Sequence, residues 1–241
     1  MTTPLLYKRV LLKISGEGLA GKEDIFDKTA LMRIAKELQG LVQQGVELCL
    51  VVGGGNIIRG KTCAEWERCV ADEMGMHATI INALALKSAL QIIGVPASVY
   101  SSLPVGTEGQ QFQRKQAIES LKKGEVVIFA GGTGLPYFST DTASVLRARQ
   151  MNCDAFLKST QVDGIYTADV RKDPKAKRYD AVSYDEVLER RLGVMDLTAV
   201  VMAKEAGLPV VVFKQGQPSG ILKVLRGQGV FTVMNEKGKK S

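Results

Sequence analysis

Two stretches of the chain are apolar without interruption, and each ends on a cluster of glycines. Residues 48–52 run into 53–55, which are all glycine, and residues 126–130 run into 131–134, which contain three glycines. A strand with one wet face alternates apolar and polar side chains, so unbroken apolar runs predict strands that are buried on both faces. Helices packed on both sides of a mainly parallel sheet provide that burial.

The segments between these runs have the apolar spacing of helices. Residues 28–44 repeat apolar side chains every three to four positions, with Asp27 suited to cap the start and Gly45 to end the helix. Further helices are expected at about 72–93, 114–122, 141–151, 183–192 and 197–206, and further strands at 10–14, 96–100, 155–158, 210–213 and, as an edge strand, 231–233. Strands that alternate with helices are joined by right-handed crossovers. We therefore predict a three-layer α/β/α sandwich with a largely parallel central sheet.

The chain contains no obvious linker or internal repeat. One domain over residues 1–241 is the simplest organisation, with a core at about 8–233 and a short polar tail at 235–241. The polar segment 161–181 is too long for a tight connection and is a candidate functional loop.

Composition argues against several functional classes. No stretch approaches the roughly 20 apolar residues of a membrane span. The four cysteines form no C-x-x-C pair and His77 is the one histidine, which disfavours structural zinc and a disulfide framework and favours a cytoplasmic protein. The net charge of +7 permits nucleic acid or a smaller anion such as a nucleotide. No basic stripe is interleaved with aromatic residues, and a solvated surface accounts for most of the positive charge, so nucleic acid is a disfavoured partner.

The first glycine-rich segment matches two well-known patterns, and both matches fail. Residues 16–21 read G-x-G-x-x-G, with Glu37 about twenty residues downstream, as in dinucleotide sites. The helix that should begin within those glycines is instead expected after Asp27, too far to place its N-terminus on a pyrophosphate. The same segment reads G-x-x-x-x-G-K, but Glu23 stands where a P-loop has the Ser or Thr that holds magnesium.

Lys13 is a better signal. It lies near the carboxyl end of the first apolar strand, just before Ser15 and Gly16. A lysine in a buried strand is costly unless its ammonium group reaches a partner or an anion. In open α/β sheets ligands bind outside the carboxyl ends of the strands. We therefore expect Lys13 to face phosphate, the alternative being a lysine that extends along the surface into water.

The other two glycine clusters also predict phosphate contacts. The run at 53–55 brings backbone N–H donors close to a ligand, and Arg59 after it could neutralise a phosphoryl group in transit. Residues 131–141 add a second such turn, several hydroxyls and Asp141 at a helix start. Tyr137 and Phe138 could face a base or ribose, although packing within the loop is the simpler reading of these two. Asp141 has a role beyond capping if it contacts Lys13 or a metal.

Six motifs occur in an order that resembles one known family. They are Lys-Ile-Ser-Gly-Glu (13–17), Gly-Gly-Gly-Asn-x-x-Arg-Gly (53–60), Asp-x-Met-Gly-Met (72–76), Gly-Thr-Gly-x-Pro-Tyr-Phe-Ser-Thr-Asp (132–141), Val-Asp-Gly-Ile-Tyr-Thr-Ala-Asp (162–169) and Val-Met-Asp-Leu-Thr-Ala (194–199). Together they resemble the amino acid kinase (carbamate kinase-like) fold family, and the third and fourth are more specific to its bacterial uridylate (UMP) kinase branch. The resemblance covers about residues 8–233.

This resemblance implies an enzyme that transfers the γ-phosphoryl group of ATP to UMP, with Mg²⁺, giving ADP and UDP in pyrimidine nucleotide (UTP/CTP) biosynthesis. The catalytic residues it implies are Lys13, Arg59, Asp141 and Asp196, the two acids ordering the lysines and the metal. The implied ATP-binding residues are Lys13, Ile14, Ser15, Gly16, Gly55, Arg59, Thr160, Tyr166 and Asp169. The implied UMP-binding residues are Gly54, Asp72, Thr133, Gly134, Leu135, Pro136, Tyr137, Phe138, Ser139 and Thr140. It assigns no metal ligands to particular residues.

The family pattern also implies a homohexamer and inhibition by UTP. Segment 21–27 is shorter than the glycine-containing loop associated with GTP activation in many relatives, and it lacks the second and third glycines. GTP activation is therefore in doubt. Two other functions stay open: an acyl-phosphate-forming amino acid kinase on the same fold, and a non-catalytic nucleotide sensor or nucleic-acid binder.

Overall fold

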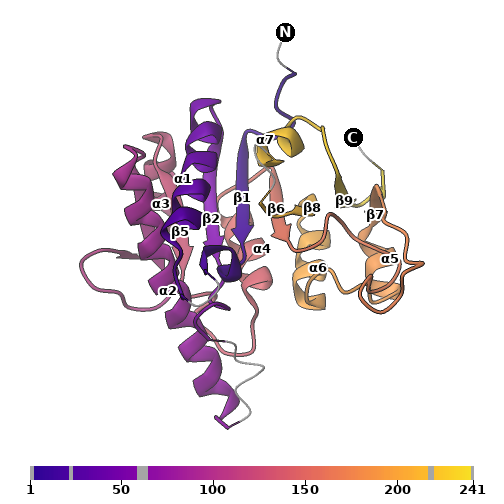
Figure 1. Ribbon diagram of the computed structural model, residues 1–241, viewed down its shortest axis with the longest axis horizontal. Helices are drawn as coiled ribbons and strands as arrows, with labels where there is room; N and C mark the ends of the chain where they lie inside the picture. The colour runs from indigo at the N-terminus through magenta and orange to yellow at the C-terminus, as the bar shows by residue number, and fades with distance from the viewer. Residues whose placement is uncertain (1–2, 22–23, 59–64, 217–219, 240–241) are drawn as a thin grey trace.

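The computed structural model describes residues 3–21, 24–58, 65–216 and 220–239 (Figure 1). Its strands are β1 (Arg9–Ile14), β2 (Glu47–Val52), β3 (Ala97–Ser101), β4 (Gln110–Gln111), β5 (Val126–Ala130), β6 (Ala155–Thr160), β7 (Ala181–Ser183), β8 (Val210–Lys214) and β9 (Phe231–Asn235). Its helices are the 3₁₀ turn η1 (Gly16–Leu19), α1 (Lys28–Gln43), α2 (Arg68–Ile92), α3 (Arg114–Lys122), α4 (Thr140–Gln150), α5 (Tyr184–Glu189), α6 (Leu197–Glu205) and α7 (Gly220–Leu225). None of these helices is long and apolar enough to cross a membrane.

The strands form one sheet in the order β4-β3-β5-β2-β1-β6-β8-β9-β7. All neighbouring pairs are parallel except β8 and β9, so β9 and β7 run against the other strands. The predicted α/β fold with a largely parallel central sheet is confirmed. In Figure 1, β1 lies near the centre, with β2 and β5 to its left and β6 and β8 to its right.

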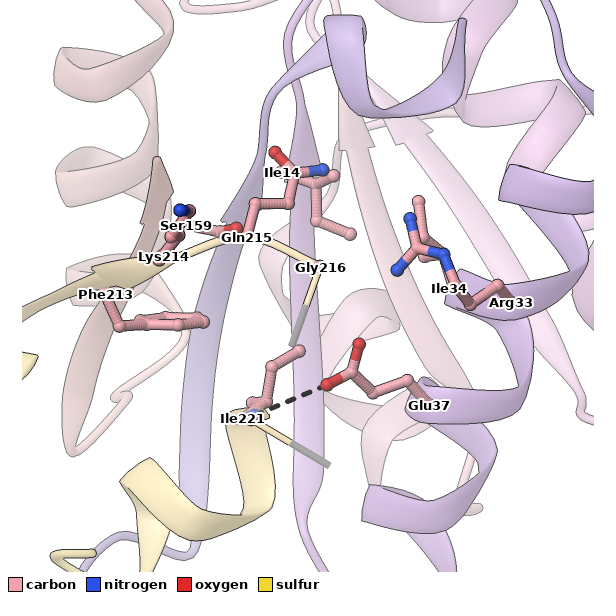
Figure 2. Close-up of a pocket in the computed structure, with 11 residues that line it drawn as sticks. Ile14, Arg33, Ile34, Glu37, Ser159, Phe213, Lys214, Gln215, Gly216 and Ile221 are labelled. Atoms are coloured by element: carbon pink, nitrogen blue, oxygen red, sulfur yellow. Dashed lines mark hydrogen bonds between the residues drawn. The ribbon is translucent and has the colours of Figure 1, made fainter. Parts of the chain in front are cut away.

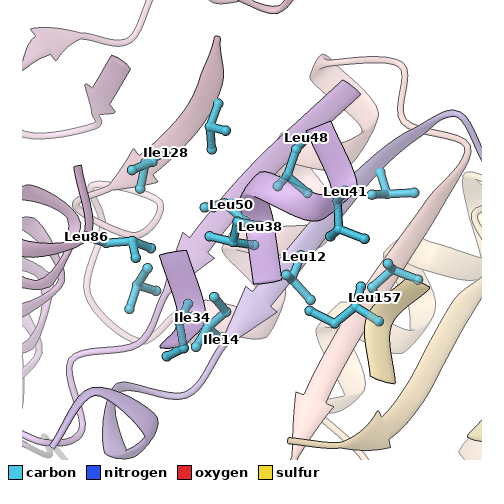
Figure 3. Close-up of a cluster of buried hydrophobic side chains, with 14 of the residues drawn as sticks. Leu12, Ile14, Ile34, Leu38, Leu41, Leu48, Leu50, Leu86, Ile128 and Leu157 are labelled. Atoms are coloured by element: carbon cyan, nitrogen blue, oxygen red, sulfur yellow. The ribbon is translucent and has the colours of Figure 1, made fainter. Parts of the chain in front are cut away.

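Each face of the sheet is covered by its own apolar core. Alternate residues of one strand divide between the two: Leu12 packs with Ile34 and Leu38 of α1, whereas Leu11 packs with Val145 of α4. The first core lies between the sheet and helices α1, α2 and α7, and Figure 3 shows its aliphatic side chains interleaved between α1 and the strands. The second lies against α3, α4, α5 and α6. Burial on both faces explains why the strand sequences are continuously apolar.

The structure confirms the predicted start of one helix and corrects that of another. Asp27 caps α1 as expected, accepting hydrogen bonds from the backbone N–H groups of Thr29 and Ala30. At α4, however, Asp141 is not the cap. The Ser139 hydroxyl takes that place and accepts from the backbone N–H groups of Asp141 and Thr142. A serine cap leaves the Asp141 carboxylate free for a different partner.

The carboxyl-terminal part of the sheet also differs from the prediction. The strand expected at the edge, β9, lies inside, between β8 and β7. The edge position belongs to β7, a three-residue strand that pairs with β9 in parallel. So short a segment has no readable apolar period, which is why β7, like β4, escapes sequence analysis.

The order of the strands identifies where a ligand should bind. The chain builds β2, β3 and β5 on one side of β1, then crosses through α4 to place β6 and β8 on the other. The sheet therefore reverses its strand order between β1 and β6, and ligands of such sheets bind outside the carboxyl ends at that point. Lys13 of β1 and Lys158 of β6 stand side by side there.

Candidate active site

Two lysines share one buried carboxylate at the reversal point. The Lys13 Nζ lies 3.4 Å from Asp141 Oδ1, and the Lys158 Nζ donates to Asp141 Oδ2. Asp141 and Lys158 are only 9% and 8% exposed. Asp141 therefore contacts Lys13, one of the two partners considered for it from the sequence. Three charges in a dry environment interact strongly, and two cations against one anion leave a net positive charge that favours an anionic ligand.

The pKa values of the triad follow from that arrangement. Burial acts to raise the pKa of Asp141, but the charges of Lys13 and Lys158 outweigh it and hold that pKa below its ordinary value. Burial lowers the pKa of Lys158, against the attraction of Asp141. The carboxylate is therefore ionised at neutral pH and serves as a fixed counter-charge, which is unsuited to accepting a proton.

Lys158 is a candidate site residue that the sequence analysis missed. It stands in the buried strand β6 for the same reason that singled out Lys13 in β1: an ammonium group among apolar neighbours needs a partner. The same argument applied to residues 155–160 would have found it. What the sequence could not supply is the register that sets Lys13 opposite Lys158.

The lysines open into a large cavity. Its volume is about 840 Å³, within the range of small-molecule sites. Its lining includes Lys13, Ser15, Thr160, Tyr166 and Asp169, and also Lys158, Arg171, Arg190 and Arg191. The structure thus brings five of the residues expected around ATP into one site, and the long polar segment 161–181 supplies much of its wall. The excess of cations suits a polyphosphate.

The wall of this cavity is held by local hydrogen bonds. The Thr160 hydroxyl bridges the carbonyl and N–H of Val162 where β6 ends. The Tyr166 hydroxyl donates to Asp163 Oδ1 over 2.6 Å. Asp169 accepts from Arg171, which together with the backbone N–H of Arg171 lowers the pKa of Asp169 to about 2. These contacts order a segment that has almost no regular structure of its own.

The glycine turns after β1 and β2 pack directly on each other. A Cβ at Gly16 would lie 2.4 Å from the Gly53 carbonyl oxygen and from Asn56 Oδ1. A Cβ at Gly54 would lie 2.8 Å from the Gly75 carbonyl oxygen of α2. Glycine is therefore required here for close backbone approach.

The other residues expected near the ATP phosphates lie around these turns or outside the described parts of the chain. Ile14 is the last residue of β1, and its side chain lies in the core. Gly55 follows Gly54 in the turn after β2. Arg59 lies outside the described residues, as do the residues 22–23 that decided the P-loop question.

We predict that Gly16→Ala destabilises the fold by about 1–3 kcal/mol, because the added methyl group must push two backbone turns apart. Thermal or urea unfolding would measure the change. The matched control is Gly40→Ala inside α1, where a Cβ meets no atom within 4 Å. That variant should gain about 0.5–1 kcal/mol from lower backbone entropy of the unfolded chain. Equal effects of the two substitutions would contradict the close packing.

The turn after β5 holds three glycines in left-handed conformations. Gly131, Gly132 and Gly134 have φ values of +73°, +57° and +82°, and Tyr137 has φ of +69° although it carries a side chain. The Tyr137 backbone N–H is fixed by Asp72 Oδ2 of α2 over 2.9 Å. Residues 133–140, expected around UMP, thus form one continuous segment: a loop as far as the α4 cap Ser139, followed by Thr140 as the first residue of α4. Asp72 is joined to this loop at Tyr137.

The aromatic residues of this loop do not pack into it. The exposed fraction of Tyr137 is 67%, and Leu135 and Phe138 are exposed as well. Loop packing, the simpler reading of Tyr137 and Phe138, is therefore wrong. The Tyr137 ring instead has the Arg68 guanidinium 5.4 Å from its centroid. The Thr133 hydroxyl donates to the Leu135 carbonyl and accepts from the Leu135 N–H, which are both local contacts.

Asp196 does not order the lysines directly. Its carboxylate caps α6 through the Ala199 N–H, and it accepts hydrogen bonds from Ser139 and, over 2.8 Å, from Thr142. No ion pair joins it to a lysine among the described residues. Asp196 fixes the start of α4, and through α4 it fixes Asp141. Its negative charge still acts on Lys158 from a distance.

A second pocket contains Glu37, the acidic residue that would contact a ribose if residues 16–21 formed a dinucleotide site. It lies between α1, the end of β8 and α7, and has a volume of about 20 Å³, which is room for about one water molecule. Figure 2 shows Glu37 in it, accepting a hydrogen bond from the Ile221 N–H over 3.4 Å. Glu37 therefore holds α7 to α1, and the site is far too small for a ribose.

The chain is similar to known proteins over nearly its whole length. The model of the amino acid kinase family matches residues 8–214. A uridylate kinase of Paramagnetospirillum magneticum is 48% identical over 97% of this chain and 99% of its own, and one of Cereibacter sphaeroides is 47% identical over 96% and 95%. Among solved structures, the UMP kinase from Bacillus anthracis has a TM-score of 0.92 and 38% identity, covering 95% of this chain and 96% of that one. This chain therefore belongs to the amino acid kinase family, among its uridylate kinases.

Proposed function

We propose that this chain is a UMP kinase, which transfers the γ-phosphoryl group of ATP to UMP and forms ADP and UDP for pyrimidine nucleotide (UTP/CTP) biosynthesis. The observation that carries the proposal is the pair of lysines on Asp141, which opens into the cavity of about 840 Å³ and is joined through Ser139 to the loop 133–140. We assign the whole activity to one domain formed by residues 1–241.

The chemistry suits these residues. A phosphate oxygen of UMP forms the new bond to the γ-phosphorus of ATP, the bond from that phosphorus to the β,γ-bridging oxygen breaks, and ADP leaves. UMP brings its nucleophilic oxygen already ionised, so no general base is needed. Phosphoryl transfer depends on positioning and charge neutralisation. Lys13 and Lys158 supply the positive charge, and Asp141 keeps both ammonium groups in place.

We divide the binding roles between the two sides of the lysines. ATP occupies the cavity, with Lys13, Ser15 and Gly16 at the phosphates and Thr160, Tyr166 and Asp169 around the adenine nucleotide. Ile14, Gly55 and Arg59 complete the phosphate region in this assignment. UMP lies against Gly54, Asp72 and the loop 133–140. Leu135, Tyr137 and Phe138 are exposed on that loop and offer apolar surface to a base.

Magnesium enters the proposal with ATP. The described parts of the chain contain no group of three or more His, Cys, Asp or Glu residues that could hold a metal by themselves. This donor set fits a Mg²⁺ that keeps phosphate and water ligands. Asp141 Oδ1 is buried, lies 3.4 Å from Lys13 Nζ and makes no hydrogen bond with the described residues, so it has acceptor capacity to join such a shell. When bound, the metal would neutralise charge on the ATP phosphates.

We also propose self-association, as a homohexamer. An apolar stripe of α2 faces outward: Val70, Met74 and Ile81 are exposed at helical spacing, beside Ile57 and Ile58. An exposed apolar patch of this kind suits a protein interface. Light scattering of the pure protein should give six times the mass of one chain, and the mass of a single chain would contradict the proposal.

Three further parts of the proposal concern regulation and location. UTP is proposed as an inhibitor. GTP activation is not proposed, because segment 21–27 departs from the family pattern. A cytoplasmic location is the one that the cysteine pattern favours.

A panel of acceptors tests the proposed function. ADP formation from ATP and Mg²⁺ is measured with UMP, CMP, AMP, GMP, glutamate, acetylglutamate or aspartate, with and without GTP and UTP. The proposal expects strong stimulation by UMP. ADP release that is the same with every acceptor would refute it, and activity with a carboxylate but not with UMP would favour an acyl-phosphate-forming kinase.

A further inference from the structure

Arg147 is a buried cation that the proposed chemistry does not use. It lies on α4 and is only 6% exposed. Its guanidinium donates to Gln150 Oε1 and Ser102 Oγ and stacks 3.9 Å from the centroid of the Phe112 ring. No carboxylate pairs with it among the described residues, and burial alone lowers the pKa of Arg147 to about 10. A buried charge without a counter-ion is costly for stability, so its retention calls for another reason.

Arg147 controls the direction of a hydrogen-bond chain. Its Nη2 is 2.6 Å from the Ser102 hydroxyl oxygen, which lies 2.8 Å from the Gly132 carbonyl oxygen. A guanidinium only donates, so the Ser102 oxygen must accept from it, and the single hydroxyl hydrogen is left for Gly132. The charge on Arg147 polarises the hydroxyl and strengthens that second bond.

This hydrogen-bond chain ends at Gly132, in the turn after β5. Gly131, Gly132 and Gly134 are all left-handed, a backbone shape that the unfolded chain adopts only part of the time. A Cβ at Gly134 would lie 3.2 Å from the Ser102 Cβ, so the turn packs closely on the segment after β3. A second fixed point is the Gly131 N–H, which donates to the Thr79 hydroxyl over 2.8 Å.

We infer that Arg147 is a positioning residue for the acceptor nucleotide, acting through Ser102 to hold the turn 131–134 in its binding conformation. The inference rests on the proposed function, since the turn leads directly into the loop assigned to UMP. In this inference Arg147 and Ser102 act together, as two links of one hydrogen-bond chain to Gly132. It also separates them from the cavity proposed for ATP, whose lining includes neither residue.

Ser102→Ala is the primary test, because it removes one small, half-buried hydroxyl and leaves the core intact. We expect the KM for UMP to rise about 10-fold, the size of effect typical for one charge-assisted hydrogen bond, with the KM for ATP unchanged. Arg147→Met should act in the same direction. The double variant should be no worse than Arg147→Met alone, since both changes break the same chain.

Ser98→Ala is the matched control. Ser98 lies on the same strand region as Ser102 and also donates from its hydroxyl, but to Glu125. This variant should keep the wild-type KM for UMP. Hydrogen exchange of residues 130–138 in the protein without nucleotides gives a second readout, and Ser102→Ala and Arg147→Met should both speed it while Ser98→Ala does not.

The outcomes distinguish the inference from the function beneath it. If the wild type does not phosphorylate UMP, the proposed function falls and this inference falls with it. If the wild type does so, but folded Ser102→Ala keeps its KM for UMP and its exchange rates, only the inference is overturned. Equal increases in the KM values for UMP and ATP would also overturn it, because they would indicate a general structural effect.

Discussion

Replacing Lys13 by methionine is expected to lower kcat by about 1,000-fold or more, on the scale seen when a group that stabilises transition-state charge is removed. Lys13 lines the cavity with its ammonium group 3.4 Å from Asp141. Methionine has a similar length and suits an apolar strand, and Lys158 still pairs with Asp141, so the fold should persist. Steady-state rates with saturating ATP and UMP, with a circular dichroism spectrum of the variant, measure the effect.

Lys36→Met is the matched control for this result. Lys36 lies on α1 and is exposed to water. The same chemical change there should leave kcat within about two-fold, since a solvated surface charge contributes little. Near-normal turnover in folded Lys13→Met would remove Lys13 from the mechanism and, with it, the role assigned to the lysine pair.

Asp141→Asn is expected to affect both activity and stability. It leaves two ammonium groups close together without their counter-charge. Breaking a buried ion pair by removing one partner costs about 3–5 kcal/mol. We therefore expect a much lower unfolding midpoint in urea, and a loss of kcat because neither lysine is held toward the phosphates.

Two comparisons make this result specific. Asp185→Asn breaks the exposed pair with Lys204 and should change the unfolding free energy by less than about 1 kcal/mol. Combining Asp141→Asn with Lys158→Met removes one of the two uncompensated charges, so the double variant should be more stable than the sum of the single losses predicts. A loss of stability in Asp141→Asn no larger than that in Asp185→Asn would contradict the buried triad.

Much of the fold could be predicted because local patterns agreed with the global one. The apolar runs at β2 and β5, the helical spacing of α1 and its Asp27 cap all specify the same layered sheet. The short strands β4 and β7 could not be predicted, because two or three residues show no period and pair only where a neighbouring strand is already placed. β9 lies inside the sheet because β7 pairs with it and takes the edge position.

The candidate site likewise contains residues that could be predicted from the sequence and residues that could not. Lys13 and the glycine turns could be predicted because a charge in an apolar strand, or three glycines in a row, conflict with local rules unless a ligand or a close approach explains them. Tyr166 and Asp169 were expected only from the family resemblance, since a polar loop has no such conflict. The meeting of Lys158 with Asp141, and of Arg147 with Ser102, depends on strand order and register.

Asp196 shows the limit of transferring roles by motif alone. The family pattern led to the expectation that it orders the lysines. The structure places it one step away, at the caps of α4 and α6. The carboxylate is near enough to influence Lys158 by its charge, but its hydrogen bonds go to hydroxyl and backbone groups. Such a distinction requires the positions of the partners in space.

The central claim is direct transfer of the γ-phosphoryl group of ATP to UMP, and the fate of that group tests it most directly. The chain is incubated with Mg²⁺, UMP and ATP that carries a radioactive γ-phosphorus, and the products are separated by chromatography. The proposal predicts label in the β-phosphate of UDP, in an amount equal to the ADP formed. Label that stays in ATP, or that is recovered as inorganic phosphate while UMP is unchanged, would contradict it.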